Sequence, residues 1–422
     1  MNMAGTIEGK GMAAAVPQET GLAVPARLSL LIFLEFFIFG GWFATLGLVL
    51  ATHGLDSIIA SAYLLSAIAA ILSPLLLGAM GDRYLPPRTV LAIAHLAGSV
   101  LMAMLPYAVD AGNGTLVLAL VFGYMLCFQP TLGLVNAYSL TLLGPRQSIF
   151  PFIRFFGLIG WVVAGLGIGI MGLSASTQIF YVTAAAGMVM AIFAMTLTRT
   201  PPPAAGARFA LGDLIGIKAL VLFRERSFTV LMICALMTSV SLGVYNSFVS
   251  PYLAALDISN VAGVLALGQA SEAIFVVTIP FVLARIGMKW ALFAGMTMWG
   301  VRFALLIAAA HGDIAFAIGG VALHGICNDY FIVVAAMYLA RVAPADLAAQ
   351  AQGWLVLMVS GFGQGIGSIL AGSIYARQVA PRLTEGATAW TPLWFVPIGL
   401  AIATAVVWTL FFRPVPLNPE TE

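Results

Sequence analysis

Twelve apolar stretches, each long enough to cross a lipid bilayer, fill most of this chain. The hydrocarbon core of a bilayer is about 30 Å thick, and an α-helix of about 20 apolar residues spans it. The predicted spans cover residues 29–51, 57–79, 89–108, 115–142, 150–172, 177–198, 227–252, 260–284, 290–310, 313–340, 348–376 and 391–412. The sequence therefore predicts an all-α polytopic membrane protein with twelve transmembrane helices.

The composition excludes a soluble globular protein. Of the 422 residues, 62% are hydrophobic and 8% are charged, whereas soluble domains carry roughly 25% charged residues. The formal net charge is +2, so the chain lacks the basic surface that neutralises nucleic-acid phosphates, and we expect no nucleic-acid partner. The composition predicts the lipid bilayer as the surrounding medium.

Motifs for a cofactor, a metal site or catalysis are not found in the sequence. The three cysteines, Cys127, Cys234 and Cys327, lack metal-ligand spacing, and the four histidines are scattered. The phosphate-binding pattern G-x-x-x-x-G-K followed by Ser or Thr does not occur, so nothing supports ATP-driven transport. We therefore expect no cofactor, no bound metal and no enzymatic activity.

The distribution of charge and proline divides the chain into two halves. Residues 199–226 contain three consecutive prolines and several Lys and Arg residues, which indicates a cytoplasmic linker. Two six-helix bundles, residues 29–198 and 227–413, lie on either side of it. Residues 1–28 and 414–422 are predicted to be cytoplasmic tails. Two bundles around a central path are typical of carriers that open one site alternately to each side of the membrane.

The positions of Lys and Arg predict the orientation of the chain, because loops rich in these residues stay in the cytoplasm. Nearly all of them lie in one set of alternate loops, the set that includes both chain ends. The opposite loops carry Asp56, Asp110, Asp257 and Asp313. We therefore predict that both termini are cytoplasmic.

Ionisable residues inside the apolar spans are the candidate functional residues, because a charge at membrane depth is costly unless it is paired or faces water. Glu272 lies well inside the eighth span, and Gln269 shares its helical face three residues earlier. We predict that both residues bind a solute and that Glu272 also carries a coupling proton. A structural ion pair at Glu272 is the alternative.

The fifth span begins with a second candidate group. Arg154, Leu158 and Trp161 share one helical face. A guanidinium group offers a rigid fork of donors and an indole ring offers a stacking plane, which together suit a polar solute that contains a ring. We predict that Arg154 and Trp161 bind the solute. In the alternative, the Arg154 side chain extends to the cytoplasmic interface.

The tenth span contains a polar cluster in an otherwise apolar helix. His324 and Asn328 share a face, and Asp329 points nearby. Such a helix either lines a water-filled path or pairs its polar groups with another helix. We predict that all three residues bind the solute and that Asp329 is a second candidate proton carrier. Asn246 in the seventh span is a further binding candidate, although amides also join helices to one another.

Glu35 in the first span is a third candidate proton carrier, with Phe39 and Trp42 on its helical face. Arg302 in the ninth span is expected to be a structural residue that pairs with Glu35 or with Asp329. His95 in the third span is expected to be a packing residue.

The loop Gly78–Arg88 resembles the loop signature of the major facilitator superfamily, and Asp82 and Arg83 in this loop are candidate gating residues. Further motifs narrow the resemblance to the nucleoside:proton symporters. These motifs are Pro130–Asn136, Ile153–Arg154 with Gly157 and Gly160, Gln269–Glu272, Thr278–Pro280, Arg302–Leu305, Asp329–Phe331, Ala351–Gly353 and Gly361–Gly363. The resemblance covers residues 29–413.

The resemblance implies the major facilitator fold and proton-driven nucleoside uptake across the bacterial inner membrane. It places the binding site between the two bundles, where matching polar or aromatic positions are Arg154, Trp161, Asn246, Gln269, Glu272 and Asp329. It also implies that the fifth and eighth helices face each other, so that Arg154 and Glu272 can pair when no proton is bound.

Five positions depart from the pattern of this family. Leu158 stands where a Thr is typical, Gly243 where a Gln is, His324 where a Tyr is, Asn328 where a Phe is, and Glu35 where a Gln is. Such changes can redirect specificity, because unpaired polar groups reject a wrong solute strongly. We predict a monomeric proton-coupled nucleoside importer. The alternatives are a proton-coupled carrier of another small hydroxylated solute, such as a sugar, and a sensor that binds its solute without translocating it.

Overall fold

A computed structural model describes residues 23–76, 84–202, 216–344 and 347–413, and every regular element in them is helical. The first half of the chain forms α1 (Ala23–Gly40), α2 (Leu46–Thr52), η1 (Asp56–Ile58), α3 (Ile59–Leu76), α5 (Pro87–Asp110), α6 (Gly114–Leu143), η3 (Gly144–Ile149), α7 (Phe150–Ile170) and α8 (Gln178–Thr196).

The second half begins with the short helix η4 (Ile217–Arg224). It continues through α10 (Arg226–Ala255), α11 (Val261–His311), α12 (Ala315–Ala322), α13 (His324–Asn328), η5 (Asp329–Val333), α14 (Val334–Val342), α15 (Ala348–Val356), η6 (Leu357–Gly363), α16 (Gln364–Ile374), η7 (Tyr375–Val379), η8 (Ala380–Trp390) and α17 (Thr391–Phe411).

Within the described residues, nine continuous helical segments are long and apolar enough to cross a membrane. Three of them, Gly114–Ile170, Val261–His311 and Ala348–Phe411, are 57, 51 and 64 residues long and hold two crossings each. In α11 the reversal falls at Gly287, whose φ of 71° is a conformation that only glycine adopts easily. The twelve predicted crossings are therefore present.

Three predicted spans are less regular than their hydropathy indicated. The first divides into α1 and α2, with a turn over residues 41–45 beside the glycine pair Gly40 and Gly41. In the tenth and eleventh spans, the π-helical turns η5, η6 and η7 interrupt the α-helix. Such turns add a residue locally and re-aim the side chains around them, and they occur often at functional sites.

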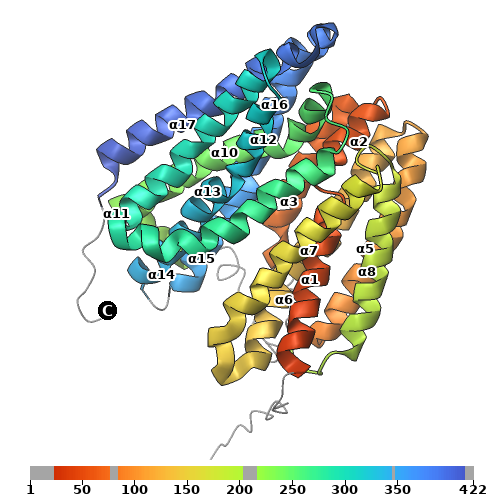
Figure 1. Ribbon diagram of the computed structural model, residues 1–422. Helices are drawn as coiled ribbons and strands as arrows, with labels where there is room; N and C mark the ends of the chain where they lie inside the picture. The colour runs from red at the N-terminus through yellow and green to blue at the C-terminus, as the bar shows by residue number, and fades with distance from the viewer. Residues whose placement is uncertain (1–22, 77–83, 203–215, 345–346, 414–422) are drawn as a thin grey trace, which may run out of the picture.

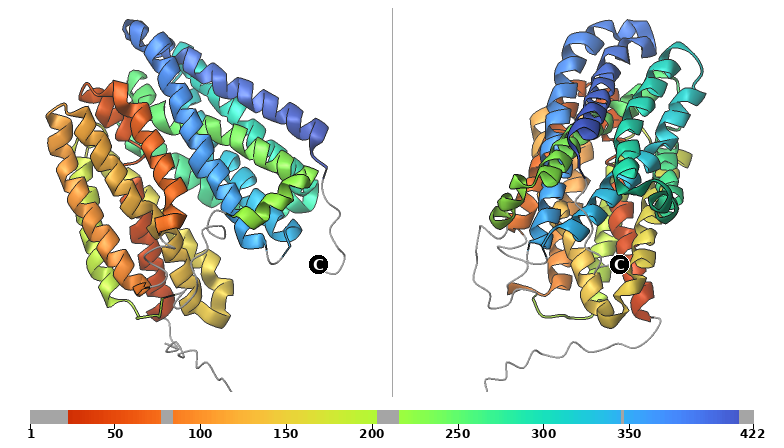
Figure 2. Two further views of the ribbon diagram at one scale, coloured as in Figure 1. Left: turned by 180° about the vertical axis from the view of Figure 1, so that it is seen from behind. Right: turned by 90° about the vertical axis from the view of Figure 1, so that its left-hand side faces the viewer.

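The helices gather in two groups that follow the order of the chain. In Figure 1, α1 to α8 lie on one side and α10 to α17 on the other, and the two turned views in Figure 2 show the same division. At the seam between the bundles, α7 packs against α11 and α3 packs against α16. These two pairs of helices join the bundles along the seam.

Hydrogen bonds between the two bundles lie at one end of the described molecule. The Leu48 amide donates to Ser250 Oγ at 3.1 Å, the Ala262 amide to Ser174 Oγ at 3.2 Å, and the Tyr375 hydroxyl to Asp56 Oδ2 at 3.3 Å. All three bonds are near the helix ends opposite the start of α1 and the end of α17. We call this region the closed end.

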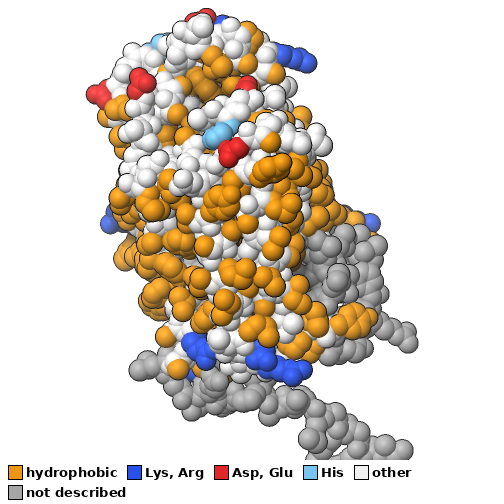
Figure 3. Space-filling view, turned by 90° about the vertical axis from the view of Figure 1, so that its right-hand side faces the viewer, with side chains coloured by type: hydrophobic (Ala, Val, Ile, Leu, Met, Phe, Trp, Pro, Cys, Tyr) orange, Lys and Arg blue, Asp and Glu red, His pale blue; other side chains and the backbone are white. Residues whose placement is uncertain are grey.

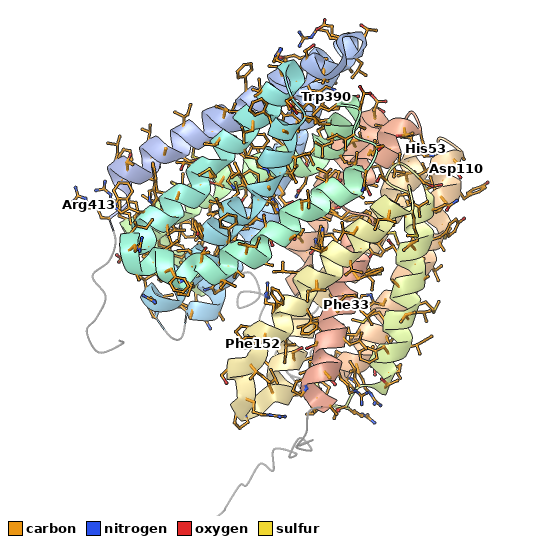
Figure 4. The ribbon with its side chains drawn as sticks, viewed as in Figure 1. Phe33, His53, Asp110, Phe152, Trp390 and Arg413 are labelled. Carbon is orange, nitrogen blue, oxygen red and sulfur yellow. The ribbon has the colours of Figure 1, made fainter. Side chains whose placement is uncertain are left out.

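The surface agrees with a protein embedded in lipid. In Figure 3 Lys and Arg side chains gather at the lower end, and a broad apolar zone separates them from the upper end, which carries Asp, Glu and His side chains together with some Lys or Arg. Figure 4 shows His53 and Asp110 side by side at the closed end, where His53 Nε2 and Asp110 Oδ1 are 3.7 Å apart. Of the predicted tails and linker, residues 1–22, 203–215 and 414–422 lie outside the described residues. Residues 23–28, predicted as part of the first tail, instead begin α1, and the second part of the linker forms η4.

Candidate functional site

A cavity of about 590 Å³ lies between the two bundles. One wall comes from α1, α3, α6 and α7, and the other from α10, α11, α13, η5, η6 and α16. All eight residues predicted to bind a solute line it: Arg154, Trp161, Asn246, Gln269, Glu272, His324, Asn328 and Asp329. Residues far apart in the sequence are thus brought to one space, as the positions of the polar groups predicted.

The wall from the first bundle is mostly aromatic. Phe36, Phe39 and Phe43 line the cavity together with Trp161, and the rings of Phe39 and Trp161 meet edge to face at 5.0 Å. A Cβ at Gly40 would come within 2.8 Å of the Trp161 ring, so glycine lets α1 approach α7 closely. Arg154 is exposed toward the cavity from this same wall.

The wall from the second bundle holds a hydrogen-bonded cluster around Glu272. Its Oε1 atom lies 3.0 Å from His324 Nε2, and it accepts hydrogen bonds from Asn328 Nδ2 at 2.7 Å and Gln269 Nε2 at 3.4 Å. Asn328 and His324 lie on consecutive turns of α13, and Gln269 lies one turn before Glu272 on α11. A buried carboxylate needs such donors, because burial removes its water.

Arg302 stabilises this cluster from behind the cavity wall. Its side chain is fully buried, its Nη1 lies 2.7 Å from His324 Nδ1, and its guanidinium carbon stacks 3.6 Å from the centroid of the Tyr245 ring. We expected Arg302 to pair with Glu35 or Asp329. In the structure it instead contacts His324, because α13 presents the imidazole ring between Arg302 and Glu272.

Asp329 also lines the cavity but remains without a partner on one oxygen. The residue is 5% exposed, and its Oδ2 atom has no hydrogen-bond partner within the described residues. A buried carboxylate oxygen in that state is costly. Because this oxygen has almost no exposed surface, it is suited to bind a proton rather than to contact a solute directly.

Glu35 lies outside the cavity lining. It is fully buried in the first bundle, where its Oε2 is 3.0 Å from His95 Nε2 and its Oε1 accepts a hydrogen bond from Thr131 at 2.5 Å. These contacts join α1 to α5 and α6. His95, which we expected to be a packing residue, is the polar partner of Glu35.

The family model for nucleoside H⁺ symporters matches residues 22–416. The chain belongs to the nucleoside H⁺ symporter family. The putative nucleoside transporter YegT of Escherichia coli (strain K12) is 32% identical, over 92% of this chain and 93% of that protein. The xanthosine permease of the same organism is 27% identical, over 93% and 96%.

A solved structure of the nucleoside transporter NupG matches the fold of this symporter with a TM-score of 0.80 and 26% identity. The match covers 92% of this chain and 99% of that one. The fold is therefore the major facilitator fold, and the resemblance seen in the sequence motifs is confirmed. The family also makes the protein a transporter rather than an enzyme.

Two predicted features of the symporter are not found in the described contacts. Arg154 and Glu272 lie near enough to interact electrostatically, yet no ion pair within 4.0 Å joins them, and the described contacts of the carboxylate are with His324, Asn328 and Gln269. The candidate gating residues Asp82 and Arg83 lie outside the described residues.

Sequence reasoning missed several polar residues of the cavity. Gln364 lines it and accepts a hydrogen bond from Asn246 Nδ2 at 2.9 Å, and Gln129 and Ser360 also line it. A single amide inside a glycine-rich membrane helix was the available signal for Gln364. The glycines around it are equally typical of close helix packing, so this signal alone did not point to the cavity.

Proposed function

We propose that this symporter imports a nucleoside together with protons, and that the cavity between its bundles is the binding site. The proposal is supported by the family assignment and by the composition of the cavity walls. A volume of about 590 Å³ is within the range of small-molecule sites. One aromatic wall and one polar wall suit a solute with a flat ring and several hydroxyl groups.

We assign the solute contacts by chemistry. Trp161 provides a stacking plane for a nucleobase, and Arg154 provides fixed donors for its carbonyl oxygens or ring nitrogens. The amides of Asn246 and Gln269 can each donate and accept, as hydroxyl groups of a ribose require. Asp329 also lines the cavity, but its Oδ2 atom is buried, so a solute can bind this oxygen only after the side chain moves.

Glu272 is the proposed coupling group, and the observation that carries the proposal is its position. Its carboxylate lines the cavity, and its described hydrogen bonds all end on Oε1. A proton can therefore bind Oε2 without breaking them. Protonation removes the charge that attracts Arg154 on the opposite bundle, which changes the balance between the two orientations of the carrier.

We further propose that both termini face the cytoplasm of a bacterial cell and that the closed end faces outward. Lys and Arg side chains at the end near the start of α1 support this orientation. The symporter would then face inward in this structure. We propose a monomer, because one chain provides both walls of the cavity.

The test is uptake of a labelled nucleoside into vesicles with an imposed pH gradient. We expect Glu272→Gln to lose accumulation above equilibrium, because the amide cannot carry the proton. Glu385→Gln is the matched control, since Glu385 lies in η8, away from the cavity lining, with its side chain 50% exposed. Full gradient-driven accumulation in Glu272→Gln would exclude this residue as the coupling group.

The solute class is tested in the same vesicles. Unlabelled nucleosides should compete with the labelled one, and sugars should not. If sugars compete and nucleosides do not, the transported solute is a sugar or a similar hydroxylated molecule and not a nucleoside. Binding without flux in the same preparation would indicate a sensor.

A further inference from the structure

Arg302 is a buried cation that takes no direct part in the cavity. It is fully buried and does not line the cavity, and no carboxylate lies within 4.0 Å of it among the described residues. Its guanidinium carbon lies 3.6 Å from the centroid of the Tyr245 ring and 5.1 Å from that of Trp299. A charge kept in such surroundings is expensive, and aromatic faces offset only part of the cost.

The contact between Arg302 and His324 defines the protonation form of the imidazole. Arg302 Nη1 lies 2.7 Å from His324 Nδ1. A guanidinium group has only donors, so the Nδ1 atom must accept and cannot carry a hydrogen. The ring hydrogen of His324 is therefore on Nε2. In a doubly protonated ring, the Nδ1–H group would point at the N–H group of Arg302, so that two donors would face each other.

The opposite edge of the ring then donates to Glu272. His324 Nε2 lies 3.0 Å from Glu272 Oε1, and Asn328 Nδ2 lies 2.7 Å from the same oxygen. His324 Nε2 and Asn328 Nδ2 are 2.9 Å apart, because both nitrogens point at Glu272 Oε1. A chain of contacts thus runs from Arg302 through His324 to Glu272 and ends at the cavity.

We infer that Arg302 is a positioning residue that keeps His324 neutral in the Nε2–H form, so that the coupling proton goes to Glu272 and not to the imidazole. His324 is then a fixed donor, although histidine is the side chain most often expected to carry a proton near neutral pH. The inference rests on the proposed role of Glu272. It concerns two residues, His324 and Asn328, that depart from the pattern typical of the family.

Other titratable groups face the same region as the His324 ring. Besides Arg302 and Glu272 on α11, these groups are Arg154 on α7, Tyr245 on α10, Cys327 on α13 and Asp329 at the start of η5. Arg302 is the group that contacts Nδ1 directly. Removing the Arg302 side chain is therefore the change that allows His324 Nδ1 to bind a proton, which would make the ring doubly protonated.

The experiment is nitrogen NMR of histidine-labelled symporter, with the His324 signals identified by their loss in His324→Gln. Protonated and unprotonated ring nitrogens give separate signals. We expect wild-type His324 to show the neutral Nε2–H form from about pH 5 to pH 8, the range in which ordinary histidines titrate. A doubly protonated ring, or an Nδ1–H form, in wild-type protein would overturn the inference.

Two variants at Arg302 separate positioning from simple structural support. In Arg302→Met, which has no donor, we expect His324 to become doubly protonated at the acidic end of the range. In Arg302→Lys, which keeps a charged donor, we expect the neutral Nε2–H form to return. A neutral His324 ring over the whole pH range in a folded Arg302→Met protein would contradict the inference. If Arg302→Met does not fold, the spectrum of the wild-type protein tests the inference instead.

Uptake by His324→Gln provides an independent test. Glutamine can donate to Glu272 but cannot carry a proton, so we expect gradient-driven accumulation to persist, with solute affinity lowered by no more than about tenfold. Loss of accumulation with retained solute exchange would assign the proton to His324 and overturn the inference. If wild-type protein transports no nucleoside, the proposed function fails, while the NMR result still decides the protonation form.

Discussion

At the scale of single residues, Glu272, Asp329 and Arg302 place ionisable groups inside apolar helices, where a charge is costly unless it is paired or faces water. The partners that such groups find depend on how the helices pack. The helical pattern gives the face on which a residue lies, but not the rotation of one helix against another. His324 therefore emerged as the partner of Arg302 only from the fold.

Glu35 provides a prediction at this scale, because its contacts indicate a structural role. In Glu35→Ala the His95 side chain loses its buried partner, and we expect the protein to be destabilised by about 3–5 kcal/mol. Thermal unfolding in detergent measures this change. Uptake per folded molecule should still respond to the pH gradient. Loss of that response with unchanged stability would instead assign a coupling proton to Glu35.

At the scale of elements, hydropathy predicted where helices cross the membrane but not where they are interrupted. The break between α1 and α2 and the π-helical turn η5 both lie inside stretches that were predicted as single continuous helices. Packing against neighbouring helices decides such details, and apolar composition does not record it. The reversal at Gly287 was predicted as a loop because charged residues flank it.

The contact between α1 and α7 gives a prediction at this scale. A Cβ at Gly160 would overlap the backbone oxygen of Phe33, which Figure 4 labels on α1, whereas a Cβ at Gly167 on the same helix would meet no atom within 4 Å. We expect Gly160→Ala to destabilise the protein by about 1–3 kcal/mol, because the helices must separate. Gly167→Ala is the control and should leave the unfolding temperature unchanged. Equal effects of both variants would contradict close packing at Gly160.

At the scale of the whole molecule, the division into two bundles and the polar residues that face the space between them followed from the sequence. The family motifs supported both. The closed end could not be predicted, because its contacts join backbone amides, single hydroxyl groups and one carboxylate that are far apart in the chain. Such contacts have no signature in the sequence.

Locking the closed end should stop transport. We expect a short thiol crosslink between Ser174→Cys and Ala262→Cys, in a background without the native cysteines, to abolish uptake until the link is cleaved, because it joins the two bundles. The control pair is His53→Cys with Asp110→Cys, which lies within the first bundle and is visible in Figure 4. That crosslink should leave uptake intact. Full uptake by the linked Ser174 and Ala262 pair would exclude opening at this end.

Glu272 and every described donor that orients it belong to one bundle. If Glu272 is the acid–base centre proposed above, a rocking motion can carry that centre as an intact unit, without remaking its bonds in each cycle. The facing wall of phenylalanine and tryptophan side chains is structurally separate from that centre. Substitutions there can change which cargo is recognised while leaving the energy source of uphill movement unaltered.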